Sequence, residues 1–164
     1  MNKKILKKLK NIHLVISDVD GVLTDGGMYY SQKGEILKKF NAKDGMGVEI
    51  LLRSKVKTIL LTREHSNIVK KRGTKIKAAA TYIGIINKES QLKKICKKFQ
   101  VSPAEIAYIG DDLNDLEIMR SVGFAVVPSD GIKDLRKIAD YVCKNNGGHG
   151  AFREIADLIV LSRH

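Results

Sequence analysis

Cysteine, proline and tryptophan are scarce in this chain, which has two cysteines, two prolines and no tryptophan in 164 residues. Cys96 and Cys143 are too few and too isolated for a disulfide framework or a zinc site, so we expect small buried thiols in a reducing compartment. No apolar run approaches the roughly 18 residues that span a bilayer, and the N-terminus lacks the apolar stretch of about 7 residues found in signal peptides. These absences predict a cytoplasmic protein.

Negative charge is also in short supply, because 30 lysines and arginines face 18 acidic residues and leave a net charge of +12. Such an excess can attract nucleic acid, an anionic membrane surface or anionic small molecules. The lysines are scattered along the whole chain, without interleaved aromatic residues or a recognised nucleic-acid motif. We therefore expect a small anionic substrate and neither a nucleic-acid nor a membrane partner. Residues 1–11 are expected to form a basic amphipathic helix.

Short apolar runs alternate with segments of helical periodicity. The clearest helix is expected over Lys88–Phe99, whose apolar residues recur at helical spacing. Strands are expected at His13–Ser17, Lys57–Thr62, Ile106–Gly110, Phe124–Val127 and Tyr141–Cys143, and further helices at Asp44–Arg53, His65–Arg72, Asp115–Val122 and Ala151–Leu161. Strands that alternate with helices predict a single α/β domain over 1–164, with a central parallel sheet covered on both faces.

One segment breaks this alternation directly after the first predicted strand. Met28–Tyr30 and Ile36–Phe40 are β-prone, and the turn residues between them are Ser31, Gln32, Lys33 and Gly34. We therefore expect a β-hairpin inserted over 26–40. Because an isolated hairpin is marginally stable in water, this one needs another surface to cover it.

Polar residues end three of the predicted strands, at Asp18, Thr62 and Asp111. In an open parallel sheet the ligand crevice lies outside the carboxyl ends of the strands, so these side chains are expected to meet there. Asp20 follows Asp18 closely, which allows one carboxylate to attack phosphorus while the other protonates the leaving oxygen. Magnesium, which prefers oxygen ligands, would offset the repulsion between carboxylates and phosphate. Lys88 and Thr62 are expected to bind the phosphoryl oxygens.

Four sequence features resemble, in order, the four motifs of the haloacid dehalogenase superfamily. They are DVDGVLTDG at 18–26, Thr62 at a strand end, Lys88, and GDDLND at 110–115. From about residue 10 to about residue 160, the chain resembles small sugar-acid phosphatases of that superfamily that lack a cap domain. Those enzymes act on 3-deoxy-octulosonate 8-phosphate (KDO 8-phosphate) or on a nonulosonate (KDN or sialic acid) 9-phosphate. The resemblance implies a Rossmann-like, three-layer α/β/α fold.

The same resemblance implies a role for each motif residue. Asp18 would be the nucleophile that forms an aspartyl phosphate, and Asp20 would be the general acid and later the base. Magnesium would bind Asp18, the backbone carbonyl of Asp20, and Asp111. Thr62 and Lys88 would hold the phosphoryl oxygens. The resemblance thus implies a magnesium-dependent phosphatase of cell-surface sugar biosynthesis.

Further residues are implied around these motifs. Asp112 or Asp115 would orient the motif lysine and the metal-bound waters. Substrate contacts are expected at Asn41, Lys43, Asp44, Gly45, Arg63, Glu64, Arg72, Lys75, Asn114 and Arg153. The chain departs from the octulosonate phosphatases at Glu49 and Glu64, where those enzymes typically carry arginine. Because Glu64 resembles the nonulosonate branch, we slightly favour a nine-carbon substrate over KDO 8-phosphate.

Two segments carry an expectation about assembly. The hairpin at 26–40 resembles the element by which these enzymes form a homotetramer. The glycine-rich segment at 145–154 resembles a tail that reaches a neighbouring subunit's site, which would bring Arg153 to that site. A flexible glycine loop before a terminal helix is the alternative interpretation of this segment, and both stay open here.

Two other functions would use the same kinds of residue. A receiver-type phosphoryl switch also combines carboxylates, Mg²⁺, a threonine and a lysine, but it usually places two adjacent acids after its first strand. Here Asp18 and Asp20 are spaced and come first. A catalytically idle domain, of the kind fused to some sialic-acid activating enzymes, has degraded motif acids, whereas all are intact here. The sequence therefore favours an enzyme that turns over.

Overall fold

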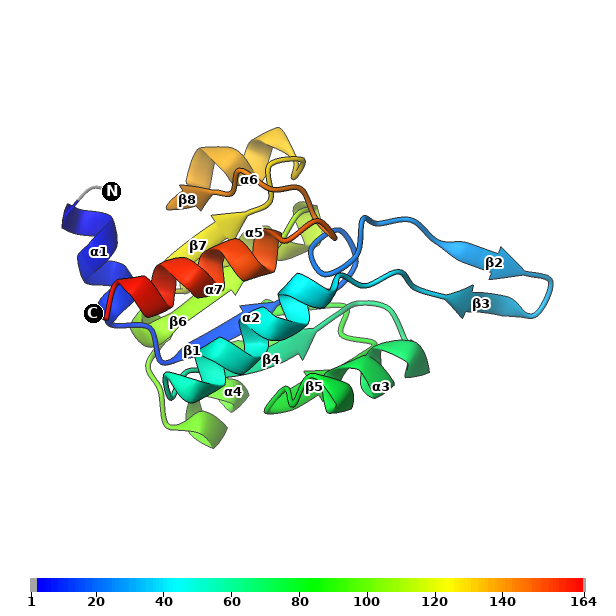
Figure 1. Ribbon diagram of the computed structural model, residues 1–164, viewed down its shortest axis with the longest axis horizontal. Helices are drawn as coiled ribbons and strands as arrows, with labels where there is room; N and C mark the ends of the chain where they lie inside the picture. Colours follow the sequence, from blue (N-terminus) through cyan, green and yellow to red (C-terminus); the bar gives the residue numbers. More distant parts are fainter. Residues whose placement is uncertain (1–2, 164) are drawn as a thin grey trace.

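The computed structural model describes residues 3–163, and a six-stranded sheet lies at its centre (Figure 1). Its strands are β1 (Leu14–Ser17), β4 (Lys57–Leu61), β5 (Ala80–Tyr82), β6 (Ile106–Ile109), β7 (Phe124–Val127) and β8 (Tyr141–Val142). The helices are α1 (Lys3–Lys10), α2 (Ala42–Arg53), α3 (Asn67–Lys75), α4 (Leu92–Phe99), α5 (Leu116–Ser121), α6 (Lys133–Ile138) and α7 (Ala151–Leu161). None of these helices is both long enough and apolar enough to cross a bilayer.

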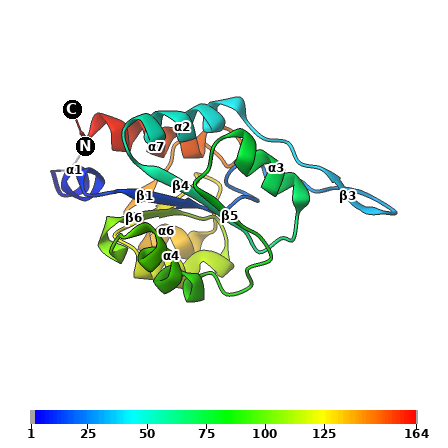
Figure 2. The same cartoon turned by 90° about the horizontal axis from the view of Figure 1, so that it is seen from below.

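Helices cover both faces of the sheet, as Figure 2 shows. Alternate strand residues point to opposite faces, so Val15 packs with α1, α2, α3 and α7, whereas Leu14 and Ile16 pack with α4, α5 and α6. Because the central strands are buried on both sides, they read as continuous apolar runs in the sequence. The predicted three-layer α/β/α fold with a parallel central sheet is confirmed.

The sheet reverses its direction of growth at β1. The strand order is β5-β4-β1-β6-β7-β8, so the chain first builds outward from β1 through β4 and β5 and then returns to the other side of β1 with β6. Ligand crevices of open α/β sheets lie at such a reversal, outside the carboxyl ends of the strands. The ends of β1 and β6, where Asp18 and Asp111 stand, meet this description.

The inserted hairpin projects from the carboxyl edge of the sheet (Figure 1). It consists of β2 (Tyr29–Ser31) and β3 (Gly34–Leu37), paired antiparallel. The predicted second strand at 36–40 is therefore misplaced. Gly34 has a φ of +101° and permits a tight turn, so pairing resumes immediately at Gly34. Lys38 to Phe40 instead lead into α2.

Two short elements were not predicted, and several boundaries differ. β5 has only three residues and α6 has six, which is too short for a periodic pattern. The helix predicted over Lys88–Phe99 begins with a 3₁₀ turn at Glu89–Gln91, and similar turns lie at Pro103–Glu105 and Leu113–Asp115. The strand at Phe124–Val127 and the helix at Ala151–Leu161 have the predicted bounds.

The glycine-rich segment at 145–154 packs inside its own chain. The Gly148 amide donates to the Val22 carbonyl at 2.9 Å, and a Cβ on Gly147 would stand 1.9 Å from the Gly21 carbonyl oxygen. From Ala151 onward the segment is α7, whose Phe152 is fully buried against α2. Within one chain the segment is therefore packed rather than extended, and its reach to a neighbouring subunit's site stays a prediction. It is a close-packed loop before a core helix.

Candidate active site

A crevice of about 390 Å³ opens at the carboxyl ends of β1, β4 and β6. Loops and turns that follow these strands supply most of its walls, and the inserted segment at 26–40 adds Gly26 and Met28. Its lining consists of Asp18, Asp20, Gly21, Gly26, Met28, Thr62, Arg63, Glu64, Asp111, Asp112, Leu113 and Asn114. Three strand-end residues predicted to meet, Asp18, Thr62 and Asp111, do so here.

A buried lysine bridges two carboxylates at the floor of this crevice. The Nζ of Lys88 lies 2.6 Å from Asp18 Oδ2 and 2.6 Å from Asp115 Oδ1, and its side chain is fully enclosed. Burial alone would lower the pKa of Lys88, but the charges of Asp18 and Asp115 raise it above its usual value. The ammonium therefore stays charged. For Asp18, burial and the neighbouring Asp115 raise the pKa, and Lys88 opposes them.

Asp115 accepts hydrogen bonds on both carboxylate oxygens. Its Oδ1 accepts from Lys88 and from the Tyr108 hydroxyl at 2.6 Å, and its Oδ2 accepts from the Asp111 amide at 2.9 Å. The Asp112 carboxylate instead accepts from the Leu113 amide, where the 3₁₀ turn begins. Of the two acids predicted to support Lys88, Asp115 is the one in contact with it. Tyr108 was not predicted, since it lies within an apolar strand.

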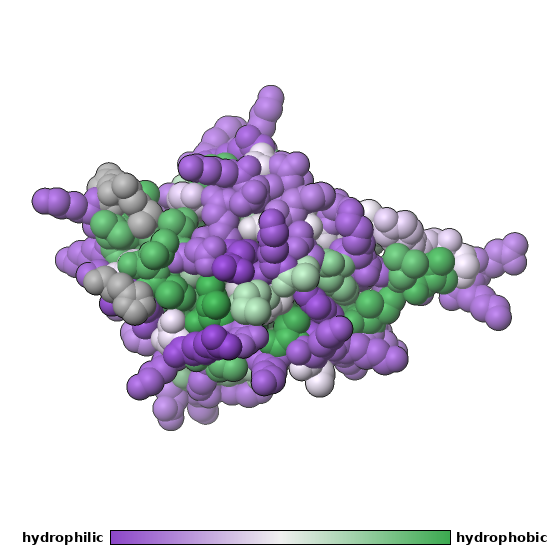
Figure 3. Space-filling model, viewed as in Figure 1, coloured by the Kyte–Doolittle hydropathy of each residue, from purple (hydrophilic) through white to green (hydrophobic). Residues whose placement is uncertain are grey.

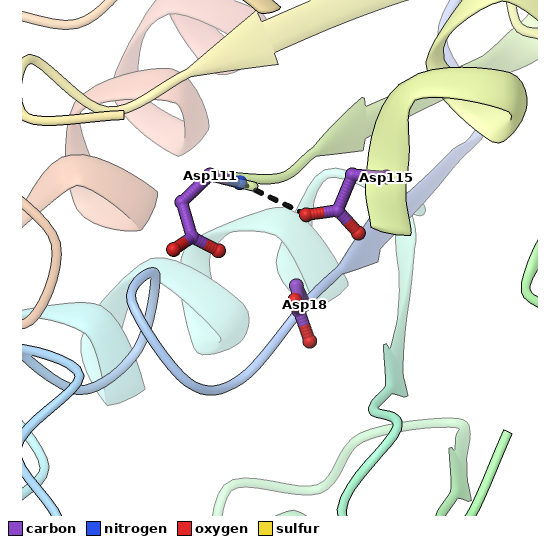
Figure 4. A group of neighbouring side chains, drawn as sticks. All are labelled: Asp18, Asp111 and Asp115. Carbon is purple, nitrogen blue, oxygen red and sulfur yellow. Dashed lines mark hydrogen bonds between the residues drawn. The ribbon is translucent and has the colours of Figure 1, made fainter. Parts of the chain in front are cut away.

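Asp18, Asp111 and Asp115 form an acidic cluster, with one oxygen of each within 4.8 Å of the others (Figure 4). Burial and Asp115 raise the pKa of Asp111 to about 7, which reflects the crowding of negative charge. Gly21, with a φ of +80°, approaches so closely that a Cβ there would lie 2.0 Å from Asp111 Oδ2. Asp115 is occupied by its hydrogen bonds, whereas Asp18 and Asp111 line the crevice. This donor set suits a hard divalent cation held by Asp18 and Asp111.

Asp20 is held from both sides. Its Oδ1 accepts from the Nζ of Lys38 at 2.5 Å, and its Oδ2 accepts from the Thr62 hydroxyl at 3.4 Å. Lys38 also pairs with Glu35 of the hairpin at 2.6 Å, and Ser66 donates to the other Glu35 oxygen. Burial acts to lower the pKa of Lys38, but its hydrogen bonds to Asp20 and Glu35 raise it. Lys38 was not predicted, because one lysine among many carries no distinguishing signal in the sequence.

The predicted substrate contacts divide into two groups. Arg63, Glu64 and Asn114 line the crevice with the motif acids. The remaining residues do not line it within this chain: Asn41, Lys43, Asp44, Gly45, Arg72, Lys75 and Arg153. The first group can contact a ligand bound to the motif acids, and the second group lies elsewhere.

Two members of the second group, Asn41 and Asp44, hold parts of the fold together. Asn41 caps α2 by accepting from the Lys43 amide, and it donates to the Gly148 carbonyl at 3.1 Å. Buried Asp44 accepts from the Arg153 amide at 2.9 Å, which joins α2 to α7. These contacts give Asn41 and Asp44 structural roles that the sequence alone did not reveal.

The cationic members of the second group line two other depressions. Arg72 and Lys75 lie with Gly45 in a groove between α2 and α3, where Arg72 donates to the Asn41 carbonyl and stands over the ring of Phe40. A separate hollow beside α7 is lined in part by Lys43 and Arg153. Neither depression includes a motif acid.

Comparison with known proteins places this geometry in a family. A family model described as haloacid dehalogenase-like hydrolase matches residues 52–155. The chain belongs to the haloacid dehalogenase-like hydrolases. The predictions of this family and of an enzyme are confirmed. The strand-end aspartates line the crevice of this hydrolase, and the buried Lys88 contacts one of them, Asp18.

Two similar proteins carry the same activity in their names. The 3-deoxy-D-manno-octulosonate 8-phosphate phosphatase KdsC of Escherichia coli is 38% identical over 159 residues, covering 97% of this chain and 85% of the relative. The crystal structure of the corresponding phosphatase from Yersinia pestis superposes with a TM-score of 0.96 at 35% identity, over 99% of this chain and 88% of that chain.

A third relative was solved with ligands bound. The Moraxella catarrhalis phosphatase was solved in complex with a magnesium ion, a phosphate ion and a KDO molecule. This hydrolase resembles it with a TM-score of 0.95 at 33% identity, over 99% of this chain and 94% of that chain.

Proposed function

We propose that this protein is a cytoplasmic, magnesium-dependent phosphatase that hydrolyses the terminal phosphate of a 2-keto-3-deoxy sugar acid. The observation that carries the proposal is the buried Lys88, which bridges Asp18 and Asp115 at the floor of an acidic crevice. Taking an ammonium and two carboxylates out of water is costly and adds little net stability, so a functional purpose is the better explanation for this arrangement. The similarity to KDO 8-phosphate phosphatases gives that purpose its chemistry.

In the proposed reaction, Asp18 attacks phosphorus and forms an aspartyl phosphate. The Val19 amide donates to Asp18 Oδ1 at 2.7 Å, and Lys88 holds Asp18 Oδ2, so the carboxylate is oriented before substrate arrives. Asp20 protonates the leaving sugar oxygen and later accepts a proton from the water that hydrolyses the aspartyl phosphate. Lys88 and the Thr62 hydroxyl stabilise the charge that develops on the phosphoryl oxygens.

A magnesium ion would be held by Asp18 and Asp111, with the backbone carbonyl of Asp20 as a further proposed ligand. When bound, it neutralises the negative charge of the substrate phosphate beside these carboxylates. Asp115 keeps Lys88 and the Asp111 amide in place.

KDO 8-phosphate is the substrate we propose first. The curated relatives from E. coli, Salmonella and Yersinia are all named for it, at 36% to 38% identity over 97% of this chain. The earlier preference for a nonulosonate 9-phosphate rests on Glu64, which lines the crevice and suits sugar hydroxyls rather than a carboxylate. The nine-carbon compound is therefore the second candidate.

We further propose that the enzyme is a homotetramer whose subunits meet through the hairpin. Exposed apolar side chains gather on it, at Met28, Tyr29, Tyr30, Ile36 and Leu37, and Figure 3 shows apolar surface on this projection. A surface of this kind suits a protein interface. In such an assembly Arg72, Lys75 or Arg153 of one subunit would reach the crevice of another and bind the substrate carboxylate.

The deciding experiment measures phosphate release and kcat/KM for KDO 8-phosphate and for a nonulosonate 9-phosphate. We expect activity with at least one, loss of activity in EDTA, and recovery on adding Mg²⁺. In Glu64→Arg, the ratio of the two kcat/KM values should move toward KDO 8-phosphate. Turnover that EDTA leaves intact, or a wild type inactive on both esters, would contradict the proposal.

Assembly has its own measurement. Light scattering at micromolar concentration should give the mass of four chains, and Tyr30→Lys together with Ile36→Lys should reduce it. A fully active monomer would refute the proposed tetramer while leaving the phosphatase chemistry intact.

A further inference from the structure

A series of polar contacts runs from the loop after β4, through the hairpin, to Asp20. Ser66 donates to Glu35 Oε2 at 2.5 Å, Glu35 Oε1 pairs with the Nζ of Lys38 at 2.6 Å, and Lys38 donates to Asp20 Oδ1 at 2.5 Å. The Lys38 side chain is fully enclosed, and Lys38 is not among the residues that line the crevice. Lys38 therefore reaches the crevice only through Asp20.

This contact fixes how Asp20 is oriented. One carboxylate oxygen is held by Lys38, and the other accepts from Thr62 at the longer distance of 3.4 Å. Without the ammonium, Asp20 and Glu35 would be two carboxylates facing the space that the ammonium had filled, and their repulsion would turn Asp20 away. A displacement of about 1 Å in a reacting group costs on the order of 10²-fold in rate.

We propose that Lys38 is a positioning residue that holds Asp20 where the leaving oxygen of the substrate is protonated. This inference rests on the proposed function, in which Asp20 is the general acid. Glu35 and Ser66 anchor Lys38 to the loop after β4, so the root of the hairpin sets the orientation of a catalytic carboxylate.

The test compares two esters that differ in their need for protonation. The leaving group of KDO 8-phosphate is a sugar alkoxide, which requires protonation by an acid. The leaving group of p-nitrophenyl phosphate is a stable phenolate, which requires little protonation. We expect Lys38→Met to lower kcat/KM for KDO 8-phosphate by about 10²-fold and that for p-nitrophenyl phosphate by less than about 10-fold. The value of kcat/KM reports steps up to transfer to Asp18, so later hydrolysis does not obscure it.

Lys39→Met is the matched control, because Lys39 is the adjacent lysine and pairs with Asp25 on the surface. It should leave both kcat/KM values unchanged. Lys38→Arg should restore part of the loss on KDO 8-phosphate, and Glu35→Gln should cause a smaller loss of the same kind. These two variants carry the test if Lys38→Met does not fold.

A double mutant separates positioning from general structural damage. If Lys38 acts through Asp20, adding Lys38→Met to Asp20→Asn should cost little beyond Asp20→Asn alone. Additive losses, or equal losses on both esters, would overturn the proposal. A wild type inactive on both esters would instead refute the proposed function.

Discussion

Lys88 and Lys38 have similar surroundings, but different parts of the molecule hold those surroundings in place. Each is enclosed by protein, and each bridges two carboxylates at 2.5 or 2.6 Å. Lys88 stands between Asp18, which directly follows β1, and Asp115, which lies in the 3₁₀ turn after β6. Lys38 stands at the root of a hairpin, between Asp20 and Glu35.

The difference lies in what holds each pair of carboxylates. Asp115 is completely buried and accepts a hydrogen bond from the Tyr108 hydroxyl of β6, so the core of the domain fixes the surroundings of Asp18, the proposed nucleophile. Asp20 and Glu35 keep side-chain exposures of 20% and 17% and depend on the hairpin. The sheet thus holds the proposed nucleophile in place, whereas the proposed acid depends on the inserted hairpin.

The largest expected effect comes from Asp18→Asn. This change keeps the shape of the side chain but removes the charged nucleophile, so kcat should fall by several orders of magnitude while the fold survives. Phosphate release and circular dichroism measure the two parts of the prediction. Asp25→Asn, in the same loop, is the control and should remain active. Near-normal activity of Asp18→Asn would refute covalent catalysis at this residue.

Lys88→Met tests how much the two buried carboxylates, Asp18 and Asp115, depend on the ammonium between them. Removing the ammonium leaves Asp18 and Asp115 uncompensated in the interior, which should lower the free energy of unfolding by about 3–5 kcal/mol. Lys38→Met should cost clearly less, because Asp20 and Glu35 retain contact with water. Urea denaturation of both variants measures the difference. Equal losses in the free energy of unfolding would show that the fold depends equally on the two lysines.

Tyr108→Phe removes one hydroxyl from the Lys88 cluster. Asp115 Oδ1 keeps its bond to Lys88 but loses the Tyr108 donor, so the free energy of unfolding should fall by about 1.5–3 kcal/mol. Because Lys88 and Asp18 stay paired, kcat should change by less than about 10-fold. A larger loss of activity than of stability would mean that the hydroxyl takes part in turnover.

Ser66→Ala should give the smallest effect, at the outer end of the Lys38 contacts. Glu35 loses one hydrogen bond there but keeps Lys38. We expect a loss of about 1 kcal/mol in the free energy of unfolding and a drop in kcat/KM of about 2- to 5-fold. Thermal unfolding and KDO 8-phosphate kinetics check both values. If Ser66→Ala lowered kcat/KM as much as Lys38→Met does, Ser66 rather than Lys38 would be the residue on which the position of Asp20 depends.

Strand ends explain why much of the site could be predicted. Asp18, Thr62 and Asp111 each follow an apolar run, and the geometry of parallel sheets brings such ends together whatever the loops do. Lys38 could not be found this way, because its burial depends on how the hairpin folds back. In the sequence, Tyr108 looks like any other core residue of an apolar strand. Its hydroxyl can be recognised as a hydrogen-bond donor only when the position of Asp115 is known.

For the predicted substrate contacts, in contrast, the sequence was a poor guide to their position. Resemblance marked Asn41, Asp44 and Arg72, yet within one chain they cap helices or join α2 to α3 and α7. A sequence pattern does not separate residues retained for packing from residues retained for a ligand, since both produce polar side chains near helix ends.

The position of β1 between β4 and β6 also sets the order in which the protein becomes active. During synthesis β1 can pair with β4 early, but its other edge must wait for β6, and the loop that carries Asp18 must wait for Gly147 and Gly148. Contacts of such long sequence separation form late and slow the folding of a chain. Catalytic turnover is therefore a sensitive reporter of complete folding, because a chain interrupted before β6 carries the nucleophile but lacks Asp111 and Asp115.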